Sequence, residues 1–100
     1  VMAAVASLGP LDILVNNAGI LIPGSVEDAE LAQWRRLMSV NADSAFLGCR
    51  EGVRAMKARG GAIVNIASVS SWMPIDGYAA YGASKAAVAA LTRSAALEAP

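Results

Sequence analysis

The chain has 100 residues, with eight basic and eight acidic side chains, no histidine and a formal charge of zero. This balance gives no basic surface for a nucleic acid or an anionic membrane, so neither partner is expected. Hydrophobic residues make up 56% of the chain, more apolar surface than one short domain can bury alone. We therefore expect a single domain at most, with its apolar excess covered by the rest of a larger fold or by other subunits.

The scarcity of cysteine and histidine limits the possible chemistry. The single cysteine, Cys49, excludes an internal disulfide and is typical of a reducing compartment, so a cytoplasmic location is expected. Without histidine, the chain can form neither a Ser-His-Asp triad nor a zinc cage, and no metal site is predicted. There is no secretory signal and no apolar stretch long enough to span a bilayer.

The first elements predicted are the end of a helix and a strand. Residues 1–8 indicate the tail of a helix, which Gly9-Pro10 ends. Residues 11–16 form a short, nearly continuous apolar run, typical of a parallel strand buried on both faces. The strand runs into Asn-Asn-Ala-Gly at 16–19, a sequence prone to turns. Because the chain begins without an initiator methionine, we expect it to be an internal piece of a longer protein.

A long helical pattern follows this strand. Ser25 and Asp28 have the spacing of a capping box and predict its start. The pattern then runs to about residue 59, with an interruption predicted near 39–41. Non-polar residues lie on two faces of its later half, which indicates contact on two sides.

The last third predicts a second strand and a second long helix. Gly60-Gly61 stops the first long helix, and residues 62–67 form another apolar run with Ser68 at its carboxyl end. The final helix is predicted at about 79–98. This order of elements predicts an α/β fold with a parallel sheet: two strands, two long helices and the end of an N-terminal helix.

A Tyr-x-x-x-Lys pair, Tyr81 and Lys85, lies on the final helix. Residues four apart share one helical face, so a phenol and an ammonium lie side by side. An unperturbed phenol has a pKa of about 10, too high for a base at neutral pH. A neighbouring cation favours the phenolate and so lowers this pKa. The pair indicates a tuned proton donor and acceptor, with Ser68 as a hydrogen-bonding partner for a substrate oxygen. Open α/β sheets bind ligands beyond the carboxyl ends of their strands, where Ser68 lies.

Four motifs in chain order resemble the classical short-chain dehydrogenase/reductase family. They are Leu-Val-Asn-Asn-Ala-Gly at 14–19, Asn41, Ile-Val-Asn-Ile-Ala-Ser at 63–68, and the Tyr-x-x-x-Lys pair at 81–85. The resemblance implies a doubly wound Rossmann-type sheet, of which residues 1–100 would be the central part of one NAD(P)-binding domain. It implies NAD or NADP as cofactor, a small-molecule alcohol or ketone as substrate, and a homo-oligomer, either a dimer or a tetramer.

The same resemblance implies a role for each motif residue. Tyr81 would be the general acid/base, and Lys85 would favour its ionised form and hydrogen-bond the nicotinamide ribose. Ser68 would polarise the substrate oxygen, Ser70 could touch the substrate, and Asn41 would anchor a water linking Lys85 to solvent. The adenosine half of the cofactor would be bordered by Asn17, Ala18 and Gly19, where glycine permits close approach of the backbone.

One part of the family pattern is absent from these residues: the Gly-rich dinucleotide fingerprint. We therefore expect the isolated chain to bind cofactor poorly and to be inactive. Residues 17–24, 46–49, 67–75 and 86–93 resemble stretches of bacterial 3β/17β-hydroxysteroid dehydrogenases, so a hydroxysteroid is the first choice of substrate. The alternatives are the same chemistry on 3-oxoacyl thioesters or sugars, and a non-catalytic relative that serves subunit assembly.

Several of these residues also have simpler interpretations. Tyr78 is another candidate phenol, but Gly82 lies four residues on, so it has no cation partner. Asn41 could be a polar residue at a helix break. Trp72 and Met73 could line an apolar substrate pocket or belong to the core. Cys49 is most simply an inert buried thiol.

Overall fold

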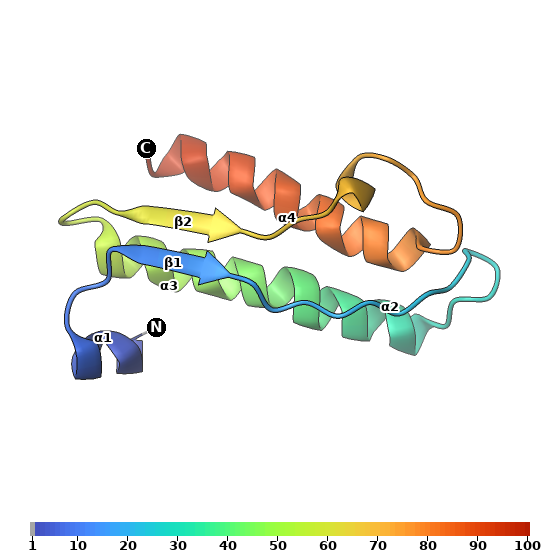
Figure 1. Ribbon diagram of the computed structural model, residues 1–100, viewed down its shortest axis with the longest axis horizontal. Coiled ribbons are helices and arrows are strands. Elements are labelled where there is room, and N and C mark those ends of the chain that lie inside the picture. The colour runs from blue at the N-terminus through green and yellow to red at the C-terminus, as the bar shows by residue number, and fades with distance from the viewer. Residues whose placement is uncertain (1) are drawn as a thin grey trace.

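The computed structural model describes residues 2–100 (Figure 1). The order of helices and strands is the predicted one, and each strand is two residues shorter than predicted. The elements are α1 (Met2–Leu8), β1 (Ile13–Asn16), α2 (Leu31–Leu37), the π-helix η1 (Met38–Asp43), α3 (Ser44–Met56), β2 (Ala62–Asn65), the 3₁₀-helix η2 (Val69–Ser71) and α4 (Ala79–Glu98).

The two strands form the predicted parallel pair. Ile13 pairs with Ala62 at one end of the sheet, and Asn16 pairs with Asn65 at the other. Both carboxyl ends therefore lie at the same edge. The turn after β1 and Ser68 after β2 leave the sheet on this side, as the sequence predicts.

Helices α3 and α4 cover one face of this sheet. The backbone of α3 approaches β1 closely at two glycines: a Cβ at Gly52 would lie 2.7 Å from Leu14 Cδ2, and a Cβ at Gly48 would overlap the side chain of Asn16. In Figure 1 the strands lie in front of α3, so the view is onto their other face. The buried apolar side chains of residues 2–100 lie on α2, α3 and α4: Leu37, Ala45, Cys49, Met56, Ala80 and Val88.

The second face of the sheet is open in residues 2–100. Ile13 is 64% exposed and Val15 52%, whereas their neighbours Leu14 and Asn16 are half-buried. The prediction that both faces of the strands are buried is therefore met on one face only, because α3 and α4 lie on the same side. The result is a slab of 47 × 26 × 15 Å.

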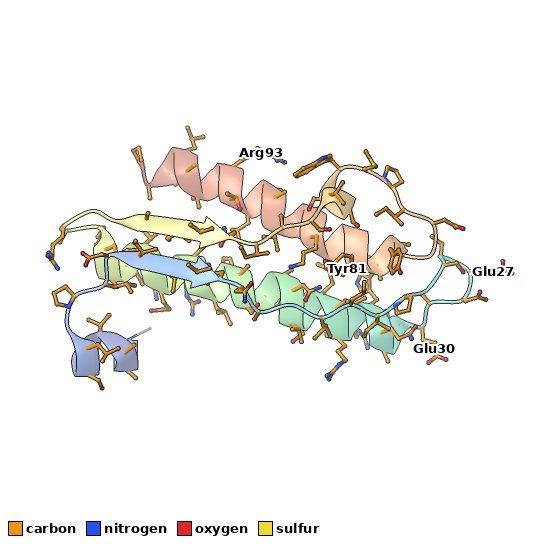
Figure 2. All side chains as sticks on the ribbon, viewed as in Figure 1. Glu27, Glu30, Tyr81 and Arg93 are labelled. Carbon is orange, nitrogen blue, oxygen red and sulfur yellow. The ribbon has the colours of Figure 1, made fainter. Side chains whose placement is uncertain are left out.

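The long helical segment begins later than predicted. Ser25 does bond to Asp28, whose N–H donates to Ser25 Oγ at 3.2 Å, but this contact closes a turn. The helix begins at Leu31, after Glu30, whose N–H donates to Gln33 Oε1 at 2.9 Å. Figure 2 shows Glu27 and Glu30 at the end of the molecule where this turn lies. The predicted interruption is confirmed: the helix widens into η1 before continuing as α3.

Glycines end two helices as predicted. Gly9 has φ +97° and its N–H donates to Val5 O at 3.0 Å, while Gly60 has φ +84° and its N–H donates to Met56 O at 2.7 Å. Both residues adopt the left-handed conformation that satisfies a helix's last carbonyls and that glycine adopts without strain. Among the described helices, none combines the length and apolar character that crossing a bilayer requires.

Candidate active site

Asn41 lies in the π-helix and is almost completely buried, with 1% of its surface exposed. Its Oδ1 accepts from Ile20 N at 2.7 Å, and its Nδ2 donates to Ile20 O at 2.9 Å. The side chain thus pairs with Ile20 as a neighbouring strand would, and fastens the segment after β1 to the long helix. Nδ2 also donates to Ser84 Oγ at 3.0 Å. Both amide protons are used, so a water here would be bound by Oδ1 or by backbone carbonyls.

Ser84 joins this pairing to α4. It has no exposed surface, and its hydroxyl donates to Tyr81 O at 2.7 Å. We call the group formed by Ile20, Asn41, Ser84 and the Tyr81 carbonyl the outer cluster. It connects the end of β1, the π-helix and the first turns of α4, three segments that are distant in sequence.

Lys85 is the next residue, 4% exposed. Its Nζ donates to Ile66 O at 3.0 Å, just beyond the end of β2. A Cβ at position 19 would lie 3.1 Å from this Nζ, so Gly19 leaves room for the ammonium. Within residues 2–100 the only salt bridges join Glu51 to Arg50 and Arg54. The buried ammonium therefore has no carboxylate partner in this part of the chain.

Tyr81 is half-buried near the start of α4, on the helical turn before Lys85 (Figure 2). Its ring meets the ring of Tyr78 edge-on, with centroids 6.5 Å apart and an interplanar angle of 70°. No hydrogen bond within residues 2–100 uses the Tyr81 hydroxyl. Within these residues the hydroxyl therefore keeps both its proton and its lone pairs available.

Ser68 stands directly before η2 and caps it. Its Oγ accepts from Ser70 N at 3.2 Å, which uses a lone pair and leaves the hydroxyl proton available for an oxygen. The short helix packs on α4 beside Tyr81: a Cβ at Gly82 would lie 3.1 Å from Ser70 O. Gly82 therefore brings the Ser68 segment close to the turn of α4 that carries Tyr81.

Ser70 and Trp72 lie on a different side of this contact. Both line a hollow of about 620 Å³ between the loop before α4 and the helix itself. The lining includes Tyr78 but not Ser68, Tyr81 or Lys85. The structure thus gathers Ser68, Tyr81, Lys85 and Asn41 around one end of α4, and leaves Ser70 at the margin of that group.

At the end of β1, the side chains of the consecutive residues Asn16 and Asn17 lie in different surroundings. Asn17 is exposed, as are Ala18 and Gly19, at the carboxyl edge of the sheet. The side chain of Asn16 points inward, and its Nδ2 donates to Asn65 Oδ1 at 2.7 Å. Of the two asparagines, Asn17 is the one available to a ligand.

Asn16 belongs to a second polar group, which we call the inner cluster: Asn16, Cys49, Asn65 and Thr92. Asn65 Nδ2 lies 3.4 Å from Cys49 Sγ and donates to Thr92 Oγ1 at 2.9 Å. The Thr92 hydroxyl in turn donates to Val88 O at 2.7 Å. Asn65, Thr92 and Ser84 were not predicted from the sequence. A signal for Thr92 and Ser84 is a hydroxyl within a helix, where its proton can bond to a carbonyl of the preceding turn.

Around this end of α4, the arrangement brings together a phenol, an uncompensated cation and a hydroxyl with a free proton. These groups can exchange a proton with an oxygen atom and stabilise negative charge that develops there. Among residues 2–100 no three His, Cys, Asp or Glu side chains gather as a metal site would need.

Comparison with known proteins gives consistent matches. A family model described as short chain dehydrogenase matches residues 1–100. The chain is 60% identical over 98 residues to the 3-beta-hydroxysteroid dehydrogenase of Comamonas testosteroni, covering 97% of this chain and 39% of that protein. It is 43% identical over 94 residues to the NADP-dependent (R)-specific alcohol dehydrogenase of Lentilactobacillus kefiri, covering 92% of this chain and 37% of that protein. The chain thus spans well under half the length of these relatives.

A solved structure agrees with these matches. A short chain dehydrogenase from Mycobacterium smegmatis superposes with a TM-score of 0.93 at 39% sequence identity, covering 98% of this chain and 42% of that one. The two strands, the interrupted long helix and α4 are therefore elements of a Rossmann-type fold.

Proposed function

The chain belongs to the short-chain dehydrogenase family, and from this premise we propose that the protein transfers hydride between NAD(P) and a secondary alcohol or its ketone. We take residues 1–100 to be the central part of one NAD(P)-binding domain. This is supported by a family match over every residue and by relatives more than twice as long.

One observation carries the proposal: Lys85 is buried with no carboxylate partner among residues 2–100, one helical turn from a phenol. Burying a charged group raises the free energy of the folded protein unless an opposite charge or hydrogen bonds stabilise that group. A transient negative charge on the Tyr81 oxygen would do so.

The proposed roles follow from the protons and lone pairs that each side chain does not use in hydrogen bonds within the structure. Tyr81 gives its proton to the carbonyl oxygen during reduction and takes it back during oxidation. Ser68 donates its free hydroxyl proton to the same oxygen and holds it beside the phenol. Asn41 holds the segment after β1 in place.

The residues present fit one part of a dinucleotide. Lys85 has three N–H donors, of which Ile66 O takes one, so donors remain for the hydroxyls of a ribose. Asn17, Ala18 and Gly19 form an exposed edge of backbone beside this ammonium. When bound, the nicotinamide would supply or accept the hydride. No Gly-rich turn for the phosphates lies within these residues.

The test is Tyr81→Phe in the complete protein, with NAD or NADP and a panel of secondary alcohols. General acid/base catalysis contributes about 100- to 10,000-fold, so turnover should fall by that range. Tyr78→Phe is the matched control, since it removes a phenol hydroxyl from the neighbouring ring and should leave turnover intact. Unchanged turnover in Tyr81→Phe would refute the role of Tyr81 and favour a non-catalytic protein that serves assembly.

We propose a hydroxysteroid as the substrate. The 60% identity to a 3-beta-hydroxysteroid dehydrogenase supports this choice, as do the exposed apolar side chains of Trp72 and Met73 that follow Ser68. The values of kcat/KM for a hydroxysteroid, a 3-oxoacyl thioester and a sugar alcohol decide between the alternatives. A higher value for either of the last two would overturn the choice.

We further propose a cytoplasmic homo-oligomer, dimer or tetramer. An apolar hollow of about 440 Å³ between α3 and α4, lined by Phe46, Val53, Leu91 and Ala95 among others, supports an interface on these helices. The single thiol of Cys49 suits a reducing compartment. Light scattering of the complete protein gives the number of subunits, and a monomer would contradict the proposal.

A further inference from the structure

The buried polar side chains of residues 2–100 are three, and they lie together: Asn41, Ser84 and Lys85. The proposed function assigns a role to Asn41 and to Lys85 but none to Ser84. A buried hydroxyl must find hydrogen-bond partners, or it costs stability. Ser84 has two, and the identity of those partners determines what it can do.

The direction of every hydrogen bond in the outer cluster is fixed by chemistry. The Ile20 N–H can only donate, so the Asn41 atom facing it must be Oδ1. The other end of the amide is therefore Nδ2, which can only donate, and Ser84 Oγ must accept from it. The single proton of Ser84 is then left for Tyr81 O, 2.7 Å away.

This chain of bonds ends on the backbone of the residue that carries the phenol. From Ile20 through Asn41 and Ser84 to Tyr81 O, it joins the segment after β1 to the first turns of α4. Ser84 lies between Tyr81 and Lys85 in sequence, and its neighbour Lys85 lies beside Gly19. A change at position 84 would therefore alter how the turn bearing both groups sits against the end of β1.

We propose that Ser84 is a positioning residue for the reaction: its hydroxyl sets the place of the Tyr81–Lys85 turn relative to the segment after β1. This inference rests on the proposed function. Ser84 touches neither substrate nor cofactor in the proposal, and it acts through Asn41 and the Tyr81 carbonyl.

The inner cluster supplies an internal control. Thr92 is on the same helix, its hydroxyl accepts from an asparagine amide at 2.9 Å, and it donates to a carbonyl of the preceding turn at 2.7 Å. Thr92 differs from Ser84 in its distance along α4 from Tyr81 and in its exposure, because Ser84 has no exposed surface and Thr92 is exposed. A general effect of losing such a hydroxyl would appear at both positions, whereas a positioning effect would appear at position 84 alone.

The experiment compares Ser84→Ala, Ser84→Thr and Thr92→Ala in the complete protein with NAD(P) and the best alcohol of the panel. Misplacing reacting groups by about 1 Å can cost about 100-fold in rate. We expect Ser84→Ala to lower kcat by roughly 10- to 100-fold with KM nearly unchanged. Ser84→Thr should recover most of kcat because it keeps the hydroxyl, and Thr92→Ala should keep the wild-type kcat.

The outcomes separate this inference from the proposed function. A wild-type protein with no NAD(P)-linked turnover would defeat the proposed function itself. An active wild type with an unchanged kcat in Ser84→Ala, or with an equal loss in Thr92→Ala, would overturn the role of Ser84. If Ser84→Ala does not fold, as judged by circular dichroism, Ser84→Cys decides: it fills the site with a weak donor, and an unaltered kcat would again overturn the role.

Discussion

The outer and inner clusters are built on the same plan. In each, an asparagine amide donates to a hydroxyl on α4, and that hydroxyl donates to a carbonyl of the preceding turn. In each, the asparagine also fastens a segment at or after a strand end: Ile20 in the outer cluster and Asn16 in the inner one. The plan is thus a general way of attaching α4 to the rest of the fold.

The two clusters differ in charge and burial. Ser84 and Asn41 are almost completely enclosed, and the buried ammonium of Lys85 lies beside them. The inner cluster contains amides, a thiol and a threonine on the exposed side of α4, with no charged side chain among its four members. The bonding pattern therefore attaches α4 at both places, and the cation and phenol beside the outer cluster make that attachment point a candidate for catalysis.

Among the changes that test the difference between the two clusters, the largest effect is expected from removing that cation. Lys85→Met keeps the length of the side chain and loses the charge, so kcat/KM of the complete protein should fall about 100- to 1,000-fold, as when a charge-stabilising group is lost. Lys57→Met at an exposed position is the control, because it removes the other lysine of the chain. Equal kinetics for both variants would mean that the two clusters do not differ in function.

The next effect concerns stability at the inner cluster. Gly48→Ala would place a Cβ where the side chain of Asn16 lies, and overpacking of this kind costs as much as about 3 kcal/mol. Urea denaturation should show the loss, while the folded variant keeps its kcat. Ser94→Ala, an exposed change on α4, should leave the midpoint where it is. A stable Gly48→Ala variant with impaired kcat would reverse the assignment of roles.

A smaller loss of stability is expected from Asn65→Leu. This change removes the hydrogen bonds of Asn65 to the Asn16 amide and to the Thr92 hydroxyl, at a cost of about 1.5 kcal/mol. The Thr92 hydroxyl keeps its bond to Val88 O. A double-mutant cycle with Thr92→Val measures how much of the cost belongs to the Asn65–Thr92 bond. The kinetic parameters should not change, and a fall in kcat like that of Ser84→Ala would show that the inner cluster also positions the phenol.

The smallest effect is expected from Gly82→Ala. The new Cβ would lie 3.1 Å from Ser70 O, so η2 must move by a few tenths of an ångström. Alanine also favours the helix by about 1 kcal/mol, which offsets the crowding, and thermal stability should hardly change. Because Ser68 precedes η2, kcat should fall by a small factor. A change confined to stability would place Ser68 outside the reaction.

The sequence predicts the framework of this structure well. Apolar runs and glycine punctuation give the order of the elements and the parallel pair, and polar residues near position 40 indicate the break that becomes η1. It fails at the start of the long helix, because Ser25 and Asp28 form a contact that serves a turn as well as a helix. The true start depends on Glu30 and Gln33, another pair of similar spacing.

The candidate site is only partly predictable for a different reason. Tyr81 and Lys85 stand out because both groups lie on one helical face four residues apart. Ser84 does not, since a serine in an alanine-rich helix usually indicates close packing. Its partner Asn41 is 43 residues away in sequence, so the bond between them exists only after α4 has docked on η1. Local patterns cannot show a role that tertiary contact creates.

The register of the sheet has a consequence for how the chain folds. Asn16 and Asn65, which pair at the end of the sheet, are 49 residues apart, and parallel pairing at such a separation must first overcome the entropy of closing the loop. The intervening helix can form locally and early, whereas the strands can meet only once it has folded back. We expect the Asn16–Asn65 bond to be a late event, so that refolding is slow and the open strands are vulnerable to aggregation until it closes.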